Sequence, residues 1–310
     1  MCECGTCGCG GKGRILDAVK KGRVLVSDGA WGTFLQNKGL QPGECPELWC
    51  LSRPNDVMDV AKAYIDAGAD MVETNSFGGT RYKLEHYHLA DRTAEINEAA
   101  AHLSRQAAGK DKWVIASVGP TGKMLAMGDV TEQDLYNAFK EQAVALAKGG
   151  ADAVCIETMS AIDEAVQAIK AARDNTGLEV ICTFTFEKTE HRGYRTMMGV
   201  TPEQAAAACL EAGADIIGAN CGNGIDRMIE IVQQMRKVAP DTPILVHANA
   251  GLPQNIDGKD VFPDTPEKMG QMVKDLVRAG ANIVGGCCGT TPAHISAMKK
   301  AVSQFNPQNL

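Results

Sequence analysis

The sequence lacks any apolar run of about 18 residues, the length that a membrane-spanning helix requires. It also lacks a basic excess: 31 Lys and Arg stand against 38 Asp and Glu, for a formal net charge of −7, which argues against nucleic acid as the main partner. The amino-terminal residues show no apolar stretch typical of a secretory signal. We therefore expect a cytoplasmic protein that acts neither on membranes nor on nucleic acids.

Cysteine, in contrast, is plentiful, with 12 residues. In a cytoplasmic protein this number favours free thiols or metal ligands over a disulfide framework. Residues 1–13 form a Cys- and Gly-rich tail, in which four thiols fall within eight residues: Cys2, Cys4, Cys7 and Cys9. Two interpretations of this tail remain open, an oxidisable segment without a fold of its own or a closed four-thiolate metal site.

An internal repeat organises the rest of the chain. A helical pattern ends at Gly, which suits a helix C-cap, and an acidic or amide residue and a short apolar run follow. Four stretches share this pattern: AGADMVETN (67–75), GGADAVCIET (149–158), AGADIIGANCG (212–222) and AGANIVGGCCG (279–289). They lie roughly 65 to 80 residues apart, so about one further helix–strand unit fits between successive copies.

Those intervening units have strands of their own, at 23–29, 112–120, 179–186 and 243–251. Together with the repeat they give eight short, mostly apolar strands, each followed by a helical segment, as a parallel sheet buried on both faces requires. We predict an α/β fold in which residues 14–310 form a single (βα)8 TIM barrel. A doubly wound open sheet is the alternative, although no G-x-G-x-x-G follows the first strand.

Three cysteines fall at the carboxyl ends of predicted strands, which is where (βα)8 barrels carry their active sites. Cys221 follows the sixth strand, and the adjacent pair Cys287 and Cys288 follows the eighth, between glycines that free the backbone from strict alternation. Three thiolates with an open fourth position is the arrangement of a catalytic zinc. We therefore predict a Zn²⁺ site here, whereas Cys155, Cys182 and Cys209 are predicted core residues.

Several motifs resemble the homocysteine S-methyltransferase family, and the resemblance runs from about residue 22 to 303. The zinc-site motifs are GGCCGTTP with an upstream NCG, and DGAWGT (28–33), TNSFGGT (74–80), GPTG (119–122) and ET (157–158) agree. TNSFGGT and GPTG look most like the homocysteine-binding barrel of cobalamin-dependent methionine synthase. The resemblance implies a (βα)8 barrel that methylates the thiol of homocysteine to give methionine, with a zinc held by Cys221, Cys287 and Cys288.

The resemblance also implies a substrate site. By carry-over, Asp28 and Glu157 bind the amino group of homocysteine, and Gly29 and Ala30 line its carboxylate side. Two carboxylates suit an ammonium group electrostatically. His247 is a further strand-end residue that could line this site.

The methyl donor is open. The chain lacks the D-x-H-x-x-G arrangement typical of cobalamin-binding modules, so methylcobalamin would have to come on a separate corrinoid protein. Single-barrel relatives use S-methylmethionine or betaine instead. Gly222-Asn223-Gly224 departs from the usual sequence after the first zinc cysteine, so another thiol acceptor, or transfer from a methylated compound to a corrinoid, also stays open. A zinc- or redox-handling protein without methyl transfer is the alternative of another class.

Overall fold

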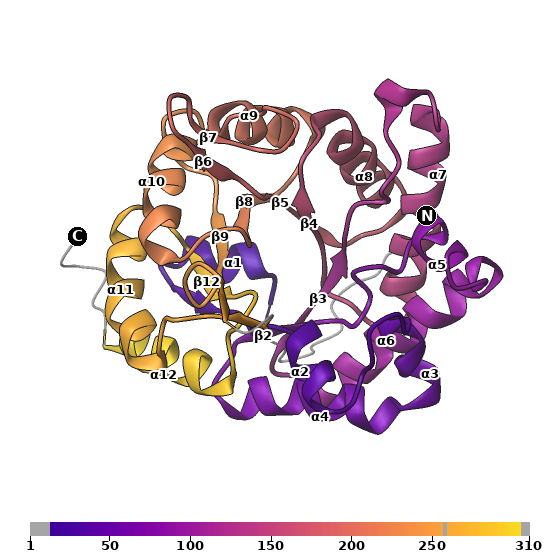
Figure 1. The fold of residues 1–310 in the computed structure, drawn as a ribbon, viewed down its shortest axis with the longest axis horizontal. Coiled ribbons are helices and arrows are strands. Elements are labelled where there is room, and N and C mark those ends of the chain that lie inside the picture. The colour runs from indigo at the N-terminus through magenta and orange to yellow at the C-terminus, as the bar shows by residue number, and fades with distance from the viewer. Residues whose placement is uncertain (1–12, 257–258, 305–310) are drawn as a thin grey trace, which may run out of the picture.

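The computed structural model describes residues 13–256 and 259–304. Eight parallel strands form a ring, and Figure 1 looks down on it with the helices outside. The strands, all predicted from the sequence, are β1 (Leu25–Val26), β2 (Met71–Glu73), β3 (Trp113–Val118), β4 (Ala153–Met159), β5 (Glu179–Phe184), β8 (Ile216–Asn220), β9 (Ile244–Ala248) and β12 (Ile283–Gly286). The predicted (βα)8 barrel is confirmed, while Cys2, Cys4, Cys7 and Cys9 lie outside the described residues.

Long helices cover the outside of the ring. They are α4 (Pro54–Asp66), α6 (Thr93–Ala108), α7 (Glu132–Lys148), α8 (Ile162–Asn175), α9 (Pro202–Ala212), α10 (Ile225–Arg236), α11 (Pro266–Arg278) and α12 (Pro292–Ser303). Shorter helices are α1 (Ile15–Lys20), α2 (Gly32–Asn37), α3 (Trp49–Ser52) and α5 (Arg81–Glu85), with 3₁₀ turns at Pro46–Leu48, Ala90–Arg92 and Leu125–Met127. None of the helices in the described ranges is long and apolar enough to span a membrane.

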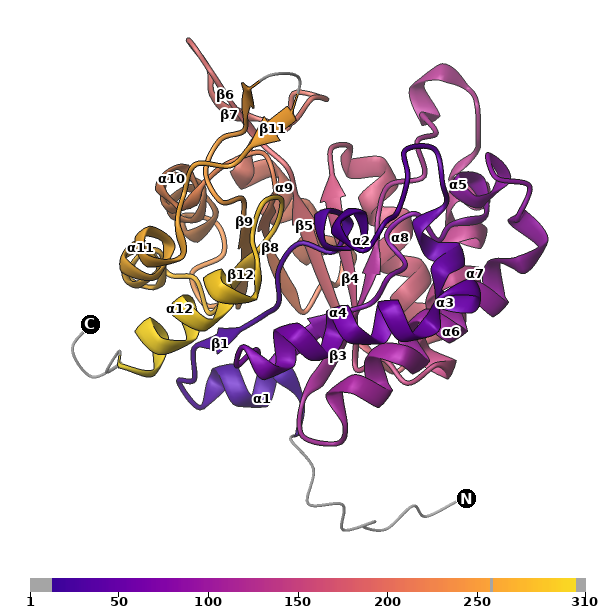
Figure 2. The same cartoon turned by 60° about the horizontal axis from the view of Figure 1, so that its bottom comes forward.

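Two hairpins were not predicted from the sequence. One pairs β6 (Glu187–Thr189) with β7 (Gly193–Arg195), and the other pairs β10 (Gln254–Ile256) with β11 (Lys259–Val261). Both rise beyond the carboxyl ends of the barrel strands, whereas α1 lies at the opposite end of the barrel (Figure 2). The hairpins therefore flank the end at which the sequence predicts the active site.

Alternation along the strands divides the core in two. Leu25, Met71 and their counterparts on the other strands pack with α1 in one cluster inside the ring. Their neighbours Val26 and Val72 belong to a second cluster between the strands and the outer helices. Because successive side chains point to opposite faces, residues two positions beyond the inner apolar layer face the inside again. That next layer is polar, and it is the floor of the candidate site.

The acid or amide of each repeat copy fixes the amino end of the barrel. Its side-chain oxygen accepts a hydrogen bond from a backbone N–H at the start of the neighbouring strand. The four contacts are Asp70 with Val26 N at 2.9 Å, Asp152 with Val114 N at 2.7 Å, Asp215 with Val180 N at 2.8 Å and Asn282 with Ile244 N at 2.9 Å. The repeat seen in the sequence is thus a repeated link between strands.

A cationic side chain completes each link from the helix outside. The pairs are Lys299 with Asp70 at 2.6 Å, Arg105 with Asp152, Arg173 with Asp215 at 3.0 Å and Arg236 with Asn282 at 2.8 Å. Asp70 also joins the edge strands β1 and β2, because its own N–H donates to Val26 O at 2.7 Å. The acids at this end are therefore partnered by both backbone and cation.

Candidate active site

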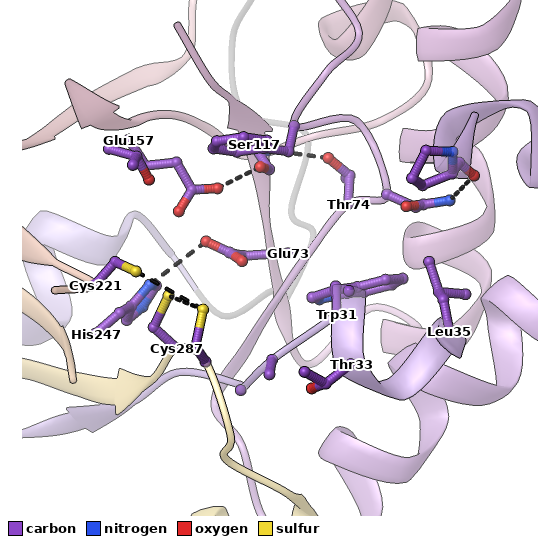
Figure 3. Close-up of a pocket in the computed structure, with 18 of the residues that line it drawn as sticks. Trp31, Thr33, Leu35, Glu73, Thr74, Ser117, Glu157, Cys221, His247 and Cys287 are labelled. Carbon is purple, nitrogen blue, oxygen red and sulfur yellow. Dashed lines mark hydrogen bonds and ion pairs between the residues drawn. The ribbon is translucent and has the colours of Figure 1, made fainter. Parts of the chain in front are cut away.

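A cavity of about 400 Å³ opens at the carboxyl ends of the strands. Its walls come from the ends of β2, β3, β4, β8, β9 and β12, from the loop that follows β1 together with α2, and from the 3₁₀ turn Pro46–Leu48 (Figure 3). Glu47, Glu73 and Glu157 line it, whereas no Lys or Arg does so in the part of the chain that the structure describes. A concave site with one sign of charge favours a ligand that carries the opposite charge.

The three predicted zinc ligands meet at one wall of this cavity. The Sγ atoms of Cys221 and Cys288 are 3.7 Å apart, and those of Cys287 and Cys288 are 4.0 Å apart. All three sulfurs lie within 4.8 Å of one another. Sulfurs at about 2.3 Å from a tetrahedral zinc lie about 3.8 Å apart, so this spacing fits the metal.

Backbone hydrogen bonds to one strand, β9, hold the thiols in place. Cys221 has a positive φ of 59° and donates its N–H to His247 O at 3.0 Å. Cys287 donates its N–H to Ala248 O at 2.8 Å, on the strand between β8 and β12. A non-glycine residue with positive φ is uncommon, and such strain is concentrated at functional sites.

The three thiols share charge even without a metal. Hydrogen bonds from Cys287 and Cys288 lower the pKa of Cys221 to about 3. The hydrogen bond to Cys221 raises the pKa of Cys288 to about 12 and that of Cys287 well above its usual range. These shifts favour a thiolate at Cys221 that two neutral thiols stabilise, and a thiolate is the form of cysteine that binds a metal ion.

A second group of possible ligands lies on the cavity floor. One ligand atom each of Glu73, Glu157 and His247 lies within 4.8 Å of the others, and all three residues are buried. His247 Nδ1 is 3.5 Å from Glu73 Oε1. Figure 3 shows the three side chains turned toward one another, beside the sulfurs.

Burial dominates the ionisation of this floor. Desolvation raises the pKa of Glu157 to about 7, and it raises the pKa of Glu73 well above its usual range, with the charge of Glu157 adding to the effect. Desolvation lowers the pKa of His247 to about 4, so the imidazole is neutral at neutral pH. The charged forms of both acids are destabilised until a cation joins them.

Glu157 is held in position by polar neighbours. Ser117 Oγ donates to its Oε1, and Asn220 Nδ2 approaches its Oε2 at 3.4 Å. Asn220 Oδ1 in turn accepts the N–H of Thr158 at 2.8 Å, which supports a positive φ of 62° at that β-branched residue. The strand end around Glu157 is thus strained and supported, as expected of a preorganised site.

Asp28 lies behind the cavity wall. Its Oδ2 accepts from Glu73 N at 2.8 Å and from Trp31 Nε1 at 2.8 Å, and its Oδ1 accepts from Ser27 Oγ at 3.1 Å. Desolvation raises its pKa to about 6, although these hydrogen bonds act in the opposite direction. Asp28 is not among the residues that line the cavity, while Gly29 and Ala30 are.

The sequence therefore predicted the three thiols and Glu157 as site residues, whereas Glu73 was recognised only as a strand-end residue and was given no role. Two signals pointed to Glu73: the Glu-Thr pair recurs in the first two repeat copies, and strand alternation places Glu73 on the same face as Met71. His247 was singled out as a strand-end residue, and it lines the cavity. Cys155, Cys182 and Cys209 are buried in the core, as predicted.

Comparisons with known proteins show what this chain is similar to. The sequence model of the family described as homocysteine S-methyltransferase matches residues 25–302. Two proteins described as methionine synthase are similar: that of Mycobacterium leprae is 32% identical over 300 residues, and that of Mycobacterium tuberculosis is 32% identical over 307 residues. These alignments cover 92% and 94% of this chain but 25% of each relative, so the chain spans about a quarter of their length.

Among solved structures, the metallated form of the homocysteine methyltransferase MmuM from Escherichia coli is similar in fold. Its TM-score is 0.75 at 22% identity, and the alignment covers 92% of this chain and 98% of MmuM. At this identity the likeness supports the barrel fold.

Proposed function

Because the chain belongs to the homocysteine S-methyltransferase family, we propose that this enzyme transfers a methyl group to the thiol of homocysteine and so forms methionine. One observation carries the proposal most directly: three thiols and three buried ligands meet in one cavity, which no Lys or Arg lines in the described ranges. A thiol substrate with an ammonium group matches both halves of that cavity. The sulfur belongs beside the cysteines, and the ammonium belongs beside the acids.

Cys221, Cys287 and Cys288 would hold the zinc, and their sulfur spacing supports this role. When bound, zinc supplies a Lewis acid that keeps the substrate sulfur in its thiolate form. The role of the protein is to hold the three cysteine sulfurs in position. The strained backbone at Cys221 and the hydrogen bonds of Cys221 and Cys287 to β9 keep the three sulfurs at one wall.

The acids would bind and orient the amino acid part of the substrate. Glu157 lines the cavity, with Ser117 and Asn220 holding its carboxylate, so it is placed to receive the ammonium. Asp28 adds negative charge from behind the wall, and Gly29 and Ala30 line the side at which we place the substrate carboxylate. A charge-assisted hydrogen bond from the ammonium to Glu157 would also offset the cost of ionising that buried acid.

For the methyl donor we propose methylcobalamin carried by a corrinoid-binding unit outside these 310 residues. The similarity to proteins described as methionine synthase, of which the chain spans a quarter, supports this choice. S-methylmethionine and betaine are the alternative donors, and transfer between another methylated compound and a corrinoid protein is the alternative reaction.

The test is a methyl-transfer assay on the zinc-loaded protein. L-Homocysteine is supplied with methylcobalamin, S-methyl-L-methionine or betaine in turn, and methionine is measured. We expect methionine from one donor, and none from the Cys221→Ala variant with any donor. A zinc-loaded protein that forms no methionine with all three donors would contradict the proposal.

A further inference from the structure

The acids around the cavity differ in how much of their hydrogen-bonding capacity is already used. Glu47 accepts from Gly78 N at 2.7 Å through Oε1 and from Cys45 Sγ at 3.4 Å through Oε2. Both oxygens of Glu157 have polar neighbours, and Asp28 accepts three hydrogen bonds. These carboxylates are largely engaged by the protein itself.

Glu73 differs from all of them. Its Oε1 is buried and has no hydrogen-bond partner, and the same is true of Nε2 of His247. A buried polar atom without a partner destabilises the protein, and natural proteins rarely leave one without a reason. The orphan oxygen faces His247 at 3.5 Å from Nδ1, in the cavity where we place the substrate.

We propose that Glu73 is the second carboxylate that receives the substrate ammonium, together with Glu157 and His247, and that Asp28 is a positioning residue. The inference rests on the proposed function and names the ammonium subsite of the same cavity. An ammonium group has three N–H donors, and the three residues offer three acceptors. These ligand atoms lie within 4.8 Å of one another, so a single nitrogen can lie at a hydrogen-bonding distance of about 2.9 Å from all three.

Asp28 has a different task in this arrangement. One of its oxygens binds the backbone N–H of Glu73 and the indole of Trp31, so it fixes the strand end that carries Glu73. Strand alternation explains its position. Leu25 packs inside the ring and Val26 outside, so continued alternation turns Ser27 inward and Asp28 away.

The test compares two thiols on the zinc-loaded full chain. L-Homocysteine carries the ammonium, and 4-sulfanylbutanoate has the same thiol and carboxylate without it. Calorimetry gives both dissociation constants for wild type, Glu73→Gln and the matched control Glu47→Gln, which changes another glutamate of the same cavity. We expect Glu73→Gln to lower the preference for L-homocysteine by about 10- to 100-fold and to leave the affinity for 4-sulfanylbutanoate almost unchanged. Glu47→Gln should keep the wild-type preference.

Three results would overturn the inference. Glu73→Gln could weaken the binding of both thiols equally. Alternatively, Asp28→Asn could lose the preference for L-homocysteine while Glu73→Gln keeps it. Wild type could also hold two zinc equivalents of which Glu73→Gln loses one, which would make the floor a second metal site. Glu73→Ala, checked for folding by circular dichroism, repeats the comparison if the amide variant does not fold. Failure of the proposed function looks different, because wild type itself would then bind neither thiol.

Discussion

The two ends of the barrel use acidic residues in opposite ways. At the amino end, the repeat acids pair with a backbone N–H and with Lys or Arg. At the carboxyl end, Glu73 and Glu157 are buried in a cavity that no Lys or Arg lines among the described residues, and Glu73 keeps an unpartnered oxygen. Two strands carry acids of both kinds: Asp70 and Asp152 directly precede β2 and β4, and Glu73 and Glu157 lie toward the carboxyl ends of these strands. At the amino end the carboxylates stabilise the barrel through their backbone and cationic partners. At the carboxyl end an unpartnered carboxylate oxygen is available to a ligand.

The difference separates stability from function along each strand. Partnered acids stabilise the fold, since their carboxylates satisfy strand N–H groups that would otherwise be buried without a partner. Unpartnered buried acids destabilise the free protein and bind a cation tightly once it arrives.

The largest effect is expected at the carboxyl end. Cys288→Ala should abolish zinc binding at the site and methyl transfer with it, because the metal loses one of three thiolates. Zinc content and methionine formation are the measurements.

Cys155→Ala is the matched control, since Cys155 is fully buried in the inner core. It should keep the zinc and lose roughly 1–2 kcal/mol of unfolding free energy through the cavity that it leaves. If the Cys288→Ala protein kept one zinc equivalent and full activity, the metal would not be bound by these cysteines at the carboxyl end.

The next effect is expected at the amino end. Asp70→Ala should lower the free energy of unfolding by roughly 2–3 kcal/mol, because Val26 N and Lys299 both lose their partner where β1 meets β2. Denaturant unfolding measures the change.

Asp70→Asn should cost less than Asp70→Ala, since Asn282 shows that an amide can make the same link in the fourth repeat copy. Equal stability of wild type and Asp70→Ala would mean that the amino-end links do not hold the ring.

A smaller effect of opposite sign is expected at the cavity floor. Glu73→Gln should raise the free energy of unfolding of the metal-free protein at pH 8 by about 1–2 kcal/mol, because burial raises the pKa of Glu73 and so disfavours the ionised form that this residue has in the unfolded chain at that pH. The gain should disappear at pH 4, where the glutamate is protonated in both the folded and the unfolded protein.

The pH dependence has a defined sign. Burial raises the pKa of Glu157 from 4.5 to about 7, so between these values the unfolded chain binds fewer protons than the folded one. The contribution of this group to stability is therefore lost as the pH rises from 4.5 to 7. Glu157→Gln should flatten that decline, and an unchanged pH profile would show that Glu157 ionises freely.

Much of this architecture was predictable from the sequence because the relevant signals are local. The four repeat copies and the apolar runs between them predicted all eight strands, and Gly285-Gly286 before Cys287 marked the cavity wall at which the three thiols meet. Gly285 allows the chain to pass close to His247, because a Cβ at this position would lie 2.8 Å from His247 Cδ2.

The parts that the sequence did not reveal depend on three-dimensional contacts. The hairpins β6–β7 and β10–β11 pair strands of three residues each, which are too short to show a clear apolar pattern. Asp28 and Glu73 show the same limit in the site. Only the contacts of the folded chain show that one is already bound to Trp31 and that the other keeps a free oxygen.

The central claim is that the carboxyl end holds a zinc with three cysteine ligands and one position for the substrate thiol. Zinc K-edge X-ray absorption of the loaded protein, with and without L-homocysteine, tests it directly. We predict three sulfur neighbours at about 2.3 Å in the free protein and four after L-homocysteine is added. A sulfur count that stays at three with saturating L-homocysteine would contradict the account.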